Sequence, residues 1–211
     1  MSDLPDLETR ELLCELLRLF YGKNWVSGTG GGICGPTADG NLLLAPTGVH
    51  KERVQPEDFF VVRIQDGSVV QTALDPTLRP SECNAIFCAI ARARGARSVV
   101  HSHALSSVLC ADLAGESDRV AIERLEMLKG IRGVANRDRH LLPVITNTPR
   151  EYELTEQVER ALDDSDFSAA HAILVRDHGA YIWGEDVWEA KRHTEVYHFL
   201  FEAACARSQD R

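Results

Sequence analysis

An apolar run that ends in two histidines, Val99-Val100-His101-Ser102-His103, constrains the fold more than any other stretch of the sequence. In a β-strand, residues i and i+2 point to the same face and lie roughly 6–7 Å apart along the chain. Both imidazoles could then reach one metal ion from the same side, whereas a helix would place them about 200° apart around its axis. The sequence therefore predicts a buried strand that ends at a metal site.

A third histidine, His178, follows another apolar run, Leu174-Val175. Three imidazoles with one open position are typical of a catalytic zinc site rather than a structural one. The alternative is that His101 and His103 are two ordinary histidines, which is the commoner meaning of a lone His-x-His pair. The place of His178 at a predicted strand end favours the metal site, because loops at such ends gather functional residues.

The whole chain limits the classes of protein to consider. Its 211 residues can bury a substantial core, and we expect one domain over residues 1–211. A formal net charge of −9 without a basic run argues against nucleic acid as a partner. No stretch approaches the ~20 apolar residues of a membrane span. The acidic N-terminus has no basic region followed by an apolar core, so we expect no signal peptide and a cytoplasmic protein.

The six cysteines are scattered and contain no Cys-x-x-Cys pair, which predicts free thiols in a reducing compartment. Cys83 stands in the first turn of a helix that we expect to run to about Arg94. The dipole of that helix would lower the pKa of the thiol. A buried, inert thiol is the alternative.

A glycine-rich stretch follows the first predicted helix. Four of the five residues 28–32 are glycine, Gly30 and Gly31 among them, and their exposed backbone N–H groups suit phosphate binding. A flexible hairpin loop is the alternative, and the spacing does not match a dinucleotide fingerprint. A later turn with Thr47, Gly48 and Lys51 could add phosphate contacts, or be an ordinary turn with a solvated lysine.

Short strands and helices interleave along the chain. We expect strands at 41–45, 59–64, 68–71, 97–103, 141–145, 172–175 and 180–183, and helices at 12–20, 81–94, 105–113, 149–162 and 186–205. This mixture predicts a three-layer α/β domain whose largely antiparallel sheet is covered by helices.

Several segments together resemble the class II aldolase family, whose members are zinc lyases and epimerases that act on sugar phosphates. They are Gly28-Thr-Gly-Gly-Gly-Ile33, Ala45-Pro-Thr-Gly-Val-His-Lys-Glu52, Gln55-Pro-Glu-Asp58, Ser81-Glu-Cys83, His101-Ser-His103, Leu125-Glu-Met-Leu-Lys-Gly130, Asn147-Thr-Pro149 and His178-Gly-Ala-Tyr-Ile-Trp-Gly184. The resemblance spans nearly the whole chain. It implies an α/β/α sandwich with a mostly antiparallel central sheet, a Zn²⁺ cofactor, a sugar phosphate substrate, and homotetramers with active sites near subunit interfaces.

The resemblance also implies roles for single residues. His101, His103 and His178 match the zinc ligands. Glu126, which by itself would be taken for a surface carboxylate, matches a general acid/base. The positions that match the substrate site are Cys83, Gly30, Gly31, Thr47, Gly48 and Lys51.

Some residues depart from the family pattern. Aldolases of the family usually carry glutamate where this chain has Cys83, which argues against aldol cleavage and favours loss of water from a sugar phosphate through an enediolate. Glu82 adds a carboxylate that could repel a phosphate. The rival expectations are an aldolase or epimerase acting on another sugar phosphate, and a non-catalytic interaction protein that has kept the fold.

Overall fold

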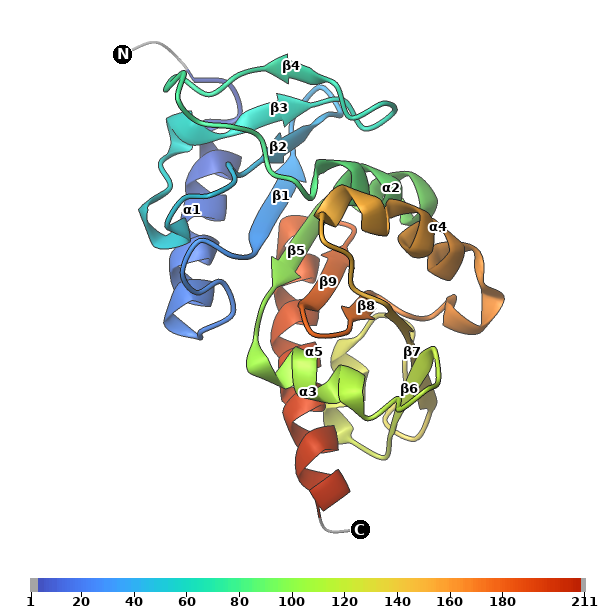
Figure 1. Ribbon diagram of the computed structural model, residues 1–211. Helices are drawn as coiled ribbons and strands as arrows, with labels where there is room; N and C mark the ends of the chain where they lie inside the picture. Colours follow the sequence, from blue (N-terminus) through green and yellow to red (C-terminus); the bar gives the residue numbers. More distant parts are fainter. Residues whose placement is uncertain (1–3, 210–211) are drawn as a thin grey trace.

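The computed structural model describes residues 4–209, and its elements are shown in Figure 1. The α-helices are α1 (Leu7–Gly22), α2 (Asn84–Arg94), α3 (Leu105–Asp112), α4 (Thr155–Asp163) and α5 (Val187–Gln209). The strands are β1 (Gly32–Pro36), β2 (Leu42–Leu44), β3 (Phe60–Val62), β4 (Val69–Gln71), β5 (Ser98–Ser102), β6 (Arg119–Glu123), β7 (Arg139–Ile145), β8 (Ala172–Val175) and β9 (Gly179–Gly184). Short 3₁₀ helices are η1 (Lys51–Arg53), η2 (Pro56–Asp58), η3 (Glu126–Gly130), η4 (Glu151–Leu154) and η5 (Ser165–Phe167).

All nine strands form one sheet in the order β4-β3-β2-β1-β5-β9-β8-β7-β6. Every neighbouring pair is antiparallel except β7 and β8, which are parallel. The expected mostly antiparallel sheet is therefore confirmed. Strand β5 lies in the middle, where Val100 pairs with Ile33 of β1 on one side and with Ile182 of β9 on the other.

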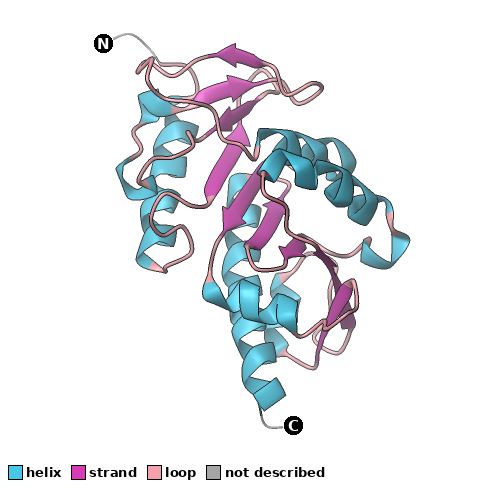
Figure 2. Ribbon diagram, in the orientation of Figure 1, coloured by secondary structure: helices cyan, strands magenta, loops and turns pink. Residues whose placement is uncertain are grey.

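Helices cover both faces of the sheet, which confirms the three layers (Figure 2). Side chains of β5 alternate between the faces, as the pleat of a strand requires. Val99 packs in the core beneath α2 and α4, whereas Val100 packs in the core beneath α1. A third apolar cluster lies between α3, α5 and the strands β6 to β9. Among residues 4–209, no helix combines the length and the apolar character needed to cross a lipid bilayer.

The direction of the strands determines which chain ends meet. β7 is parallel to β8, and β5 has the same direction, because β9 is antiparallel to both β5 and β8. The C-terminal ends of β5, β7 and β8 therefore lie along one edge of the sheet. Gly179 keeps the turn after β8 close to the end of β5, since a Cβ atom there would stand 2.0 Å from the carbonyl oxygen of Ser102.

Candidate metal centre

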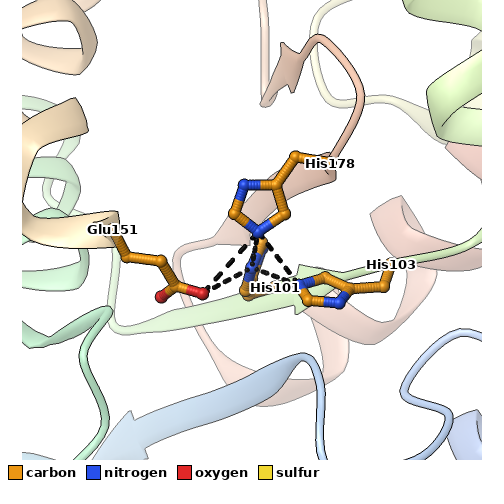
Figure 3. A group of neighbouring side chains, drawn as sticks. All are labelled: His101, His103, Glu151 and His178. Carbon is orange, nitrogen blue, oxygen red and sulfur yellow. Dashed lines mark hydrogen bonds and ion pairs between the residues drawn. The ribbon is translucent and has the colours of Figure 1, made fainter. Parts of the chain in front are cut away.

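The three histidines predicted to bind metal lie together at this edge of the sheet. His101 and His103 come from the end of β5, and His178 comes from the turn between β8 and β9. Their Nε2 atoms converge, as Figure 3 shows: His103 and His101 are 2.8 Å apart, His101 and His178 3.2 Å, and His178 and His103 3.1 Å. The local geometry of one strand and the neighbouring turn thus produces a cluster of three imidazoles.

Hydrogen bonds on the far side of two rings decide which nitrogen carries the proton. Nδ1 of His101 lies 3.1 Å from the carbonyl oxygen of Ala180, and Nδ1 of His178 lies 3.0 Å from Oδ1 of Asn147. Both oxygens accept, so each Nδ1 donates its proton and each Nε2 turns a lone pair toward the other. Two lone pairs 3.2 Å apart repel unless a cation lies between them. The donor set therefore fits a divalent metal.

The third ring is held in the neutral form that a metal ligand needs. Burial, together with repulsion from any positive charge on the neighbouring imidazoles, lowers the pKa of His103 to about 3. Tyr181 supports the cluster from β9, because its ring stacks on His101 with centroids 4.1 Å apart and planes 7° from parallel.

A carboxylate that the sequence did not single out joins the three imidazoles. Glu151, at the start of η4, places Oε1 3.5 Å from Nε2 of His101 and 3.6 Å from Nε2 of His178. Burial raises the pKa of this carboxyl, whereas protonated His101 and His178, and the hydrogen bond from Cys83, would lower it. In the sequence, Glu151 is one of several acidic residues after Pro149, and nothing local distinguishes it.

Cys83 lies against this carboxylate, and the expectation of an activated thiol is wrong. Its Sγ donates a hydrogen bond to Oε2 of Glu151 over 2.6 Å. Burial raises the pKa of the thiol well above its usual value, and the charge of Glu151 raises it further. The residue is the N-cap of α2, where the helix dipole would lower the thiol pKa. The exclusion of water and the nearby negative charge of Glu151 both raise this pKa, and together they outweigh the dipole.

The glycine loop packs directly against the histidines. A Cβ atom on Gly30 would stand 2.4 Å from Nδ1 of His103, so only glycine leaves room for this ring. Gly31 has φ +71°, and its Cβ would meet the carbonyl oxygen of His101 at 2.7 Å. The buried ammonium of Lys51 donates to the carbonyl oxygen of Thr29 over 2.8 Å, which ties the same loop in place.

Burial lowers the pKa of Lys51, and the negative charge of Glu151 nearby partly opposes this effect. The solvated lysine considered from the sequence is therefore wrong. The turn at Thr47 and Gly48 lies at the surface, and the amide of Thr47 donates to the carbonyl oxygen of Arg79 over 3.0 Å.

Glu126 is not among the residues that gather at the histidines. It begins η3, its side chain is 70% exposed, and it accepts hydrogen bonds from Lys129 and Asn136, each over 2.6 Å. Those hydrogen bonds lower the pKa of its carboxyl. Together with Arg124, Asn136 and Arg137 it lines a surface hollow. Within residues 4–209, the cluster of potential metal ligands consists of the three histidines and Glu151.

Comparison with known sequences identifies relatives along most of the chain. The family described as Class II Aldolase and Adducin N-terminal domain matches residues 11–205. Methylthioribulose-1-phosphate dehydratase from Gallus gallus is 39% identical over 210 residues, which cover 96% of this chain and 85% of the relative. A probable bifunctional methylthioribulose-1-phosphate dehydratase/enolase-phosphatase E1 from Oryza sativa subsp. indica is 39% identical over 209 residues. Those residues are 93% of this chain and 40% of the rice protein, so the chain spans less than half of that relative.

Solved structures share the fold. An L-fuculose 1-phosphate aldolase superposes with a TM-score of 0.78 at 16% identity, covering 99% of this chain and 90% of its own. The L-fuculose-1-phosphate aldolase from Thermus thermophilus gives a TM-score of 0.67 at 21% identity, covering 96% of this chain and 94% of its own. At these identities the likeness establishes the architecture alone.

Proposed function

The chain belongs to the class II aldolase and adducin family, and we propose that it is a methylthioribulose-1-phosphate dehydratase, a zinc-dependent carbon–oxygen lyase of methionine salvage. The observation that carries the proposal is the convergence of three imidazoles, two of which turn an Nε2 lone pair toward the same point, in a relative of the chicken dehydratase. The rice relative is also named for an enolase-phosphatase, but this chain spans 40% of it, and we propose only the dehydratase activity.

The proposed reaction removes water from 5-methylthioribulose 1-phosphate and gives 2,3-diketo-5-methylthiopentyl 1-phosphate. The proton leaves C3, the hydroxyl leaves C4, and the enol that results tautomerises to the diketone. His101, His103 and His178 would hold the zinc, which when bound acts as a Lewis acid on substrate oxygens. The hydrogen bonds at Nδ1 of His101 and His178 hold both rings in orientation, which supports a preformed site.

Glu126 is the proposed general acid/base, which takes the C3 proton and returns it to the departing hydroxyl. Since Glu126 is exposed and lies outside the histidine cluster, we propose that it serves the metal centre of a neighbouring subunit in a homotetramer. Burial in such an interface would raise the pKa of its carboxyl toward neutrality, where a general base works best. Arg124 and Arg137, beside Glu126, would accompany it to that interface.

Mixed oligomers test this assignment without depending on the substrate pose. Histidine-deficient His101→Ala and base-deficient Glu126→Gln subunits are each expected to be inactive alone. If the two are co-expressed, some sites combine an intact histidine cluster with an intact Glu126 from the neighbour, and random mixing restores about a quarter of wild-type activity. Mixed oligomers that form but stay inactive would place Glu126 and its histidines in the same subunit, or the base elsewhere.

The substrate phosphate is proposed to bind between the glycine loop and the turn at Thr47 and Gly48. The amide of Gly30 already donates to the carbonyl oxygen of Ser27 over 3.2 Å, so we propose that Gly30 leaves room for the ligand while Gly31 offers its amide, and that Lys51 supplies a buried positive charge behind the loop. Held in this way, the phosphate would fix the C3–H bond near the base.

The experiment that tests the function is incubation of the zinc-loaded protein with 5-methylthioribulose 1-phosphate, followed by NMR of the products. We expect the 2,3-diketone phosphate. Retro-aldol fragments would instead make the protein an aldolase, and an unchanged substrate in the presence of bound zinc would refute the dehydratase. We also propose a cytoplasmic location, which the six free cysteines support because disulfides are rare in reducing compartments.

A further inference from the structure

Glu151 is the residue of η4 whose side chain lies next to the histidine cluster. Its Oε1 lies 3.5 Å from Nε2 of His101 and 3.6 Å from Nε2 of His178, while the three Nε2 atoms are 2.8 to 3.2 Å from one another. An ion with four ligands at about 2.0–2.2 Å in a tetrahedron requires ligand atoms about 3.3–3.6 Å apart. The carboxylate oxygen therefore stands at about one such edge length from two of the three nitrogens, those of His101 and His178 (Figure 3).

We propose that Glu151 is the fourth protein ligand of the metal and closes the site in the absence of substrate. The charge of the cluster supports this role, because the lone pairs of His101 and His178 and one anionic oxygen face a common centre. A water molecule in the middle could donate only two hydrogen bonds to these three acceptors, whereas a divalent cation would satisfy all of them.

The two oxygens of Glu151 have separate partners. Oε1 faces the imidazoles, and Oε2 accepts the hydrogen bond from Sγ of Cys83 over 2.6 Å. Cys83 is 2% exposed, and its amide donates to Oγ of Ser81 over 3.2 Å, so the thiol has a fixed position. The hydroxyl of Tyr181 approaches the same sulfur at 4.0 Å. Cys83 is thus a positioning residue that directs Oε1 toward the metal.

Accessibility indicates which ligand can be exchanged. The side chain of Glu151 is 22% exposed, compared with 12% for His178 and 0% for His101. A substrate oxygen that arrives from solvent would therefore replace the carboxylate and leave the imidazoles bound. This exchange rests on the proposed function, because a catalytic zinc site needs a position for its substrate.

The test is the zinc affinity of the full-length protein, measured by competition with a chromophoric chelator. We expect Glu151→Gln to weaken zinc binding at least about tenfold, since even residues that only support metal ligands contribute 10–100-fold. The matched control is Glu153→Gln, two residues further along η4, whose exposed side chain lies outside the cluster and whose affinity should stay within about twofold of wild type. An affinity of Glu151→Gln within twofold of wild type would overturn the proposal.

A crystal structure of the zinc-loaded protein distinguishes a ligand from a mere neighbour. We expect Oε1 of Glu151 at about 2.0–2.2 Å from the zinc. A distance beyond about 3 Å, with a water as the fourth ligand, would refute ligation even if the affinity fell. Neither the zinc affinity nor the crystal structure needs the substrate, so the proposed ligation by Glu151 can fail while the proposed dehydratase activity stands. Failure of the wild-type protein to bind zinc would refute both proposals.

Substitution of Cys83 tests the positioning role. Cys83→Ser keeps a hydroxyl donor for Oε2 and should retain most of the zinc affinity, whereas Cys83→Ala removes the donor and should lose several-fold. The variants differ by one oxygen atom, so a general effect of packing would change both affinities alike. Equal zinc affinities for the two variants would mean that Cys83 does not position Glu151.

Discussion

Substitution of Gly30 by alanine should damage the metal centre through a single methyl group. A Cβ atom at this position would stand 2.4 Å from Nδ1 and 2.9 Å from Cε1 of His103. Ordinary contact between such atoms begins at about 3.5 Å, so the ring must retreat by about 1 Å. Metal–ligand distances tolerate deviations of only about 0.2 Å, and His103 therefore ceases to be a good ligand.

We expect the zinc affinity of Gly30→Ala to fall about 10–100-fold, comparable to the loss of a residue that orients a ligand. The matched control is Gly32→Ala in β1, where a Cβ atom would have no heavy atom within 4 Å outside its chain neighbours. The assay is competition between each protein and a chromophoric chelator for zinc, with the melting temperature of the metal-free form as a check on folding.

Zinc affinity of Gly30→Ala equal to that of the wild type, with His103 unmoved in a crystal structure, would refute the reasoning. Loss of affinity in Gly32→Ala as well would show that the loop responds to any added side chain, so that contact with His103 would not be the cause. A lower melting temperature in Gly30→Ala alone would not explain weaker binding, because affinity is measured on the folded fraction.

Other perturbations test separate parts of the site and of the fold. His101→Ala should remove most of the bound zinc and all activity, which metal analysis and the product assay would check; an active, metal-free variant would exclude the site. Glu126→Gln should keep its zinc but lose turnover by about 10²–10⁴-fold, as is usual for an acid/base residue, and near-normal turnover would move the base elsewhere. The free energy of unfolding of the metal-free protein should fall as the pH drops from about 6.5 toward 4, because burial lowers the pKa of His140 to about 4 and of His198 to about 3. In that interval the unfolded chain binds protons that the folded chain excludes, at a cost on the order of 1 kcal/mol per pH unit and histidine. Chemical denaturation at several pH values measures this slope, and a constant stability between pH 7 and 5 would contradict it.

Local rules were sufficient to identify the three imidazoles as candidate ligands. His101 and His103 share a face because the period of a strand is two, and the apolar run before them identifies the strand. The main helices were also predicted, since their apolar residues repeat at helical spacing. Two strands were missed. β1 begins inside the glycine loop and contains Gly35 and Pro36, which hide its strand character, and β6 is a short strand at the edge of the sheet.

The position of Glu126 shows that a single subunit does not contain the surroundings that its proposed role requires. Its proposed role came from a resemblance, and in the structure its carboxylate is exposed, with a pKa lowered by hydrogen bonds from Lys129 and Asn136. If the residue works in an interface, the surroundings that would raise its pKa belong to another subunit. Neither the periodicity of the sequence nor the fold of a single subunit can supply them.

The carboxylate of Glu151 was missed for a different reason, which lies in the direction of the strands. It follows β7, whereas His103 follows β5 and His178 follows β8. These three strand ends meet at one edge only because β7 is parallel to β8 and β9 reverses the chain between β8 and β5. One antiparallel step in place of the parallel one would put Glu151 at the opposite edge. Pairing over such separations depends on the whole sheet, so topology brings Glu151 to the site, whereas spacing alone puts only His101 and His103 on one face.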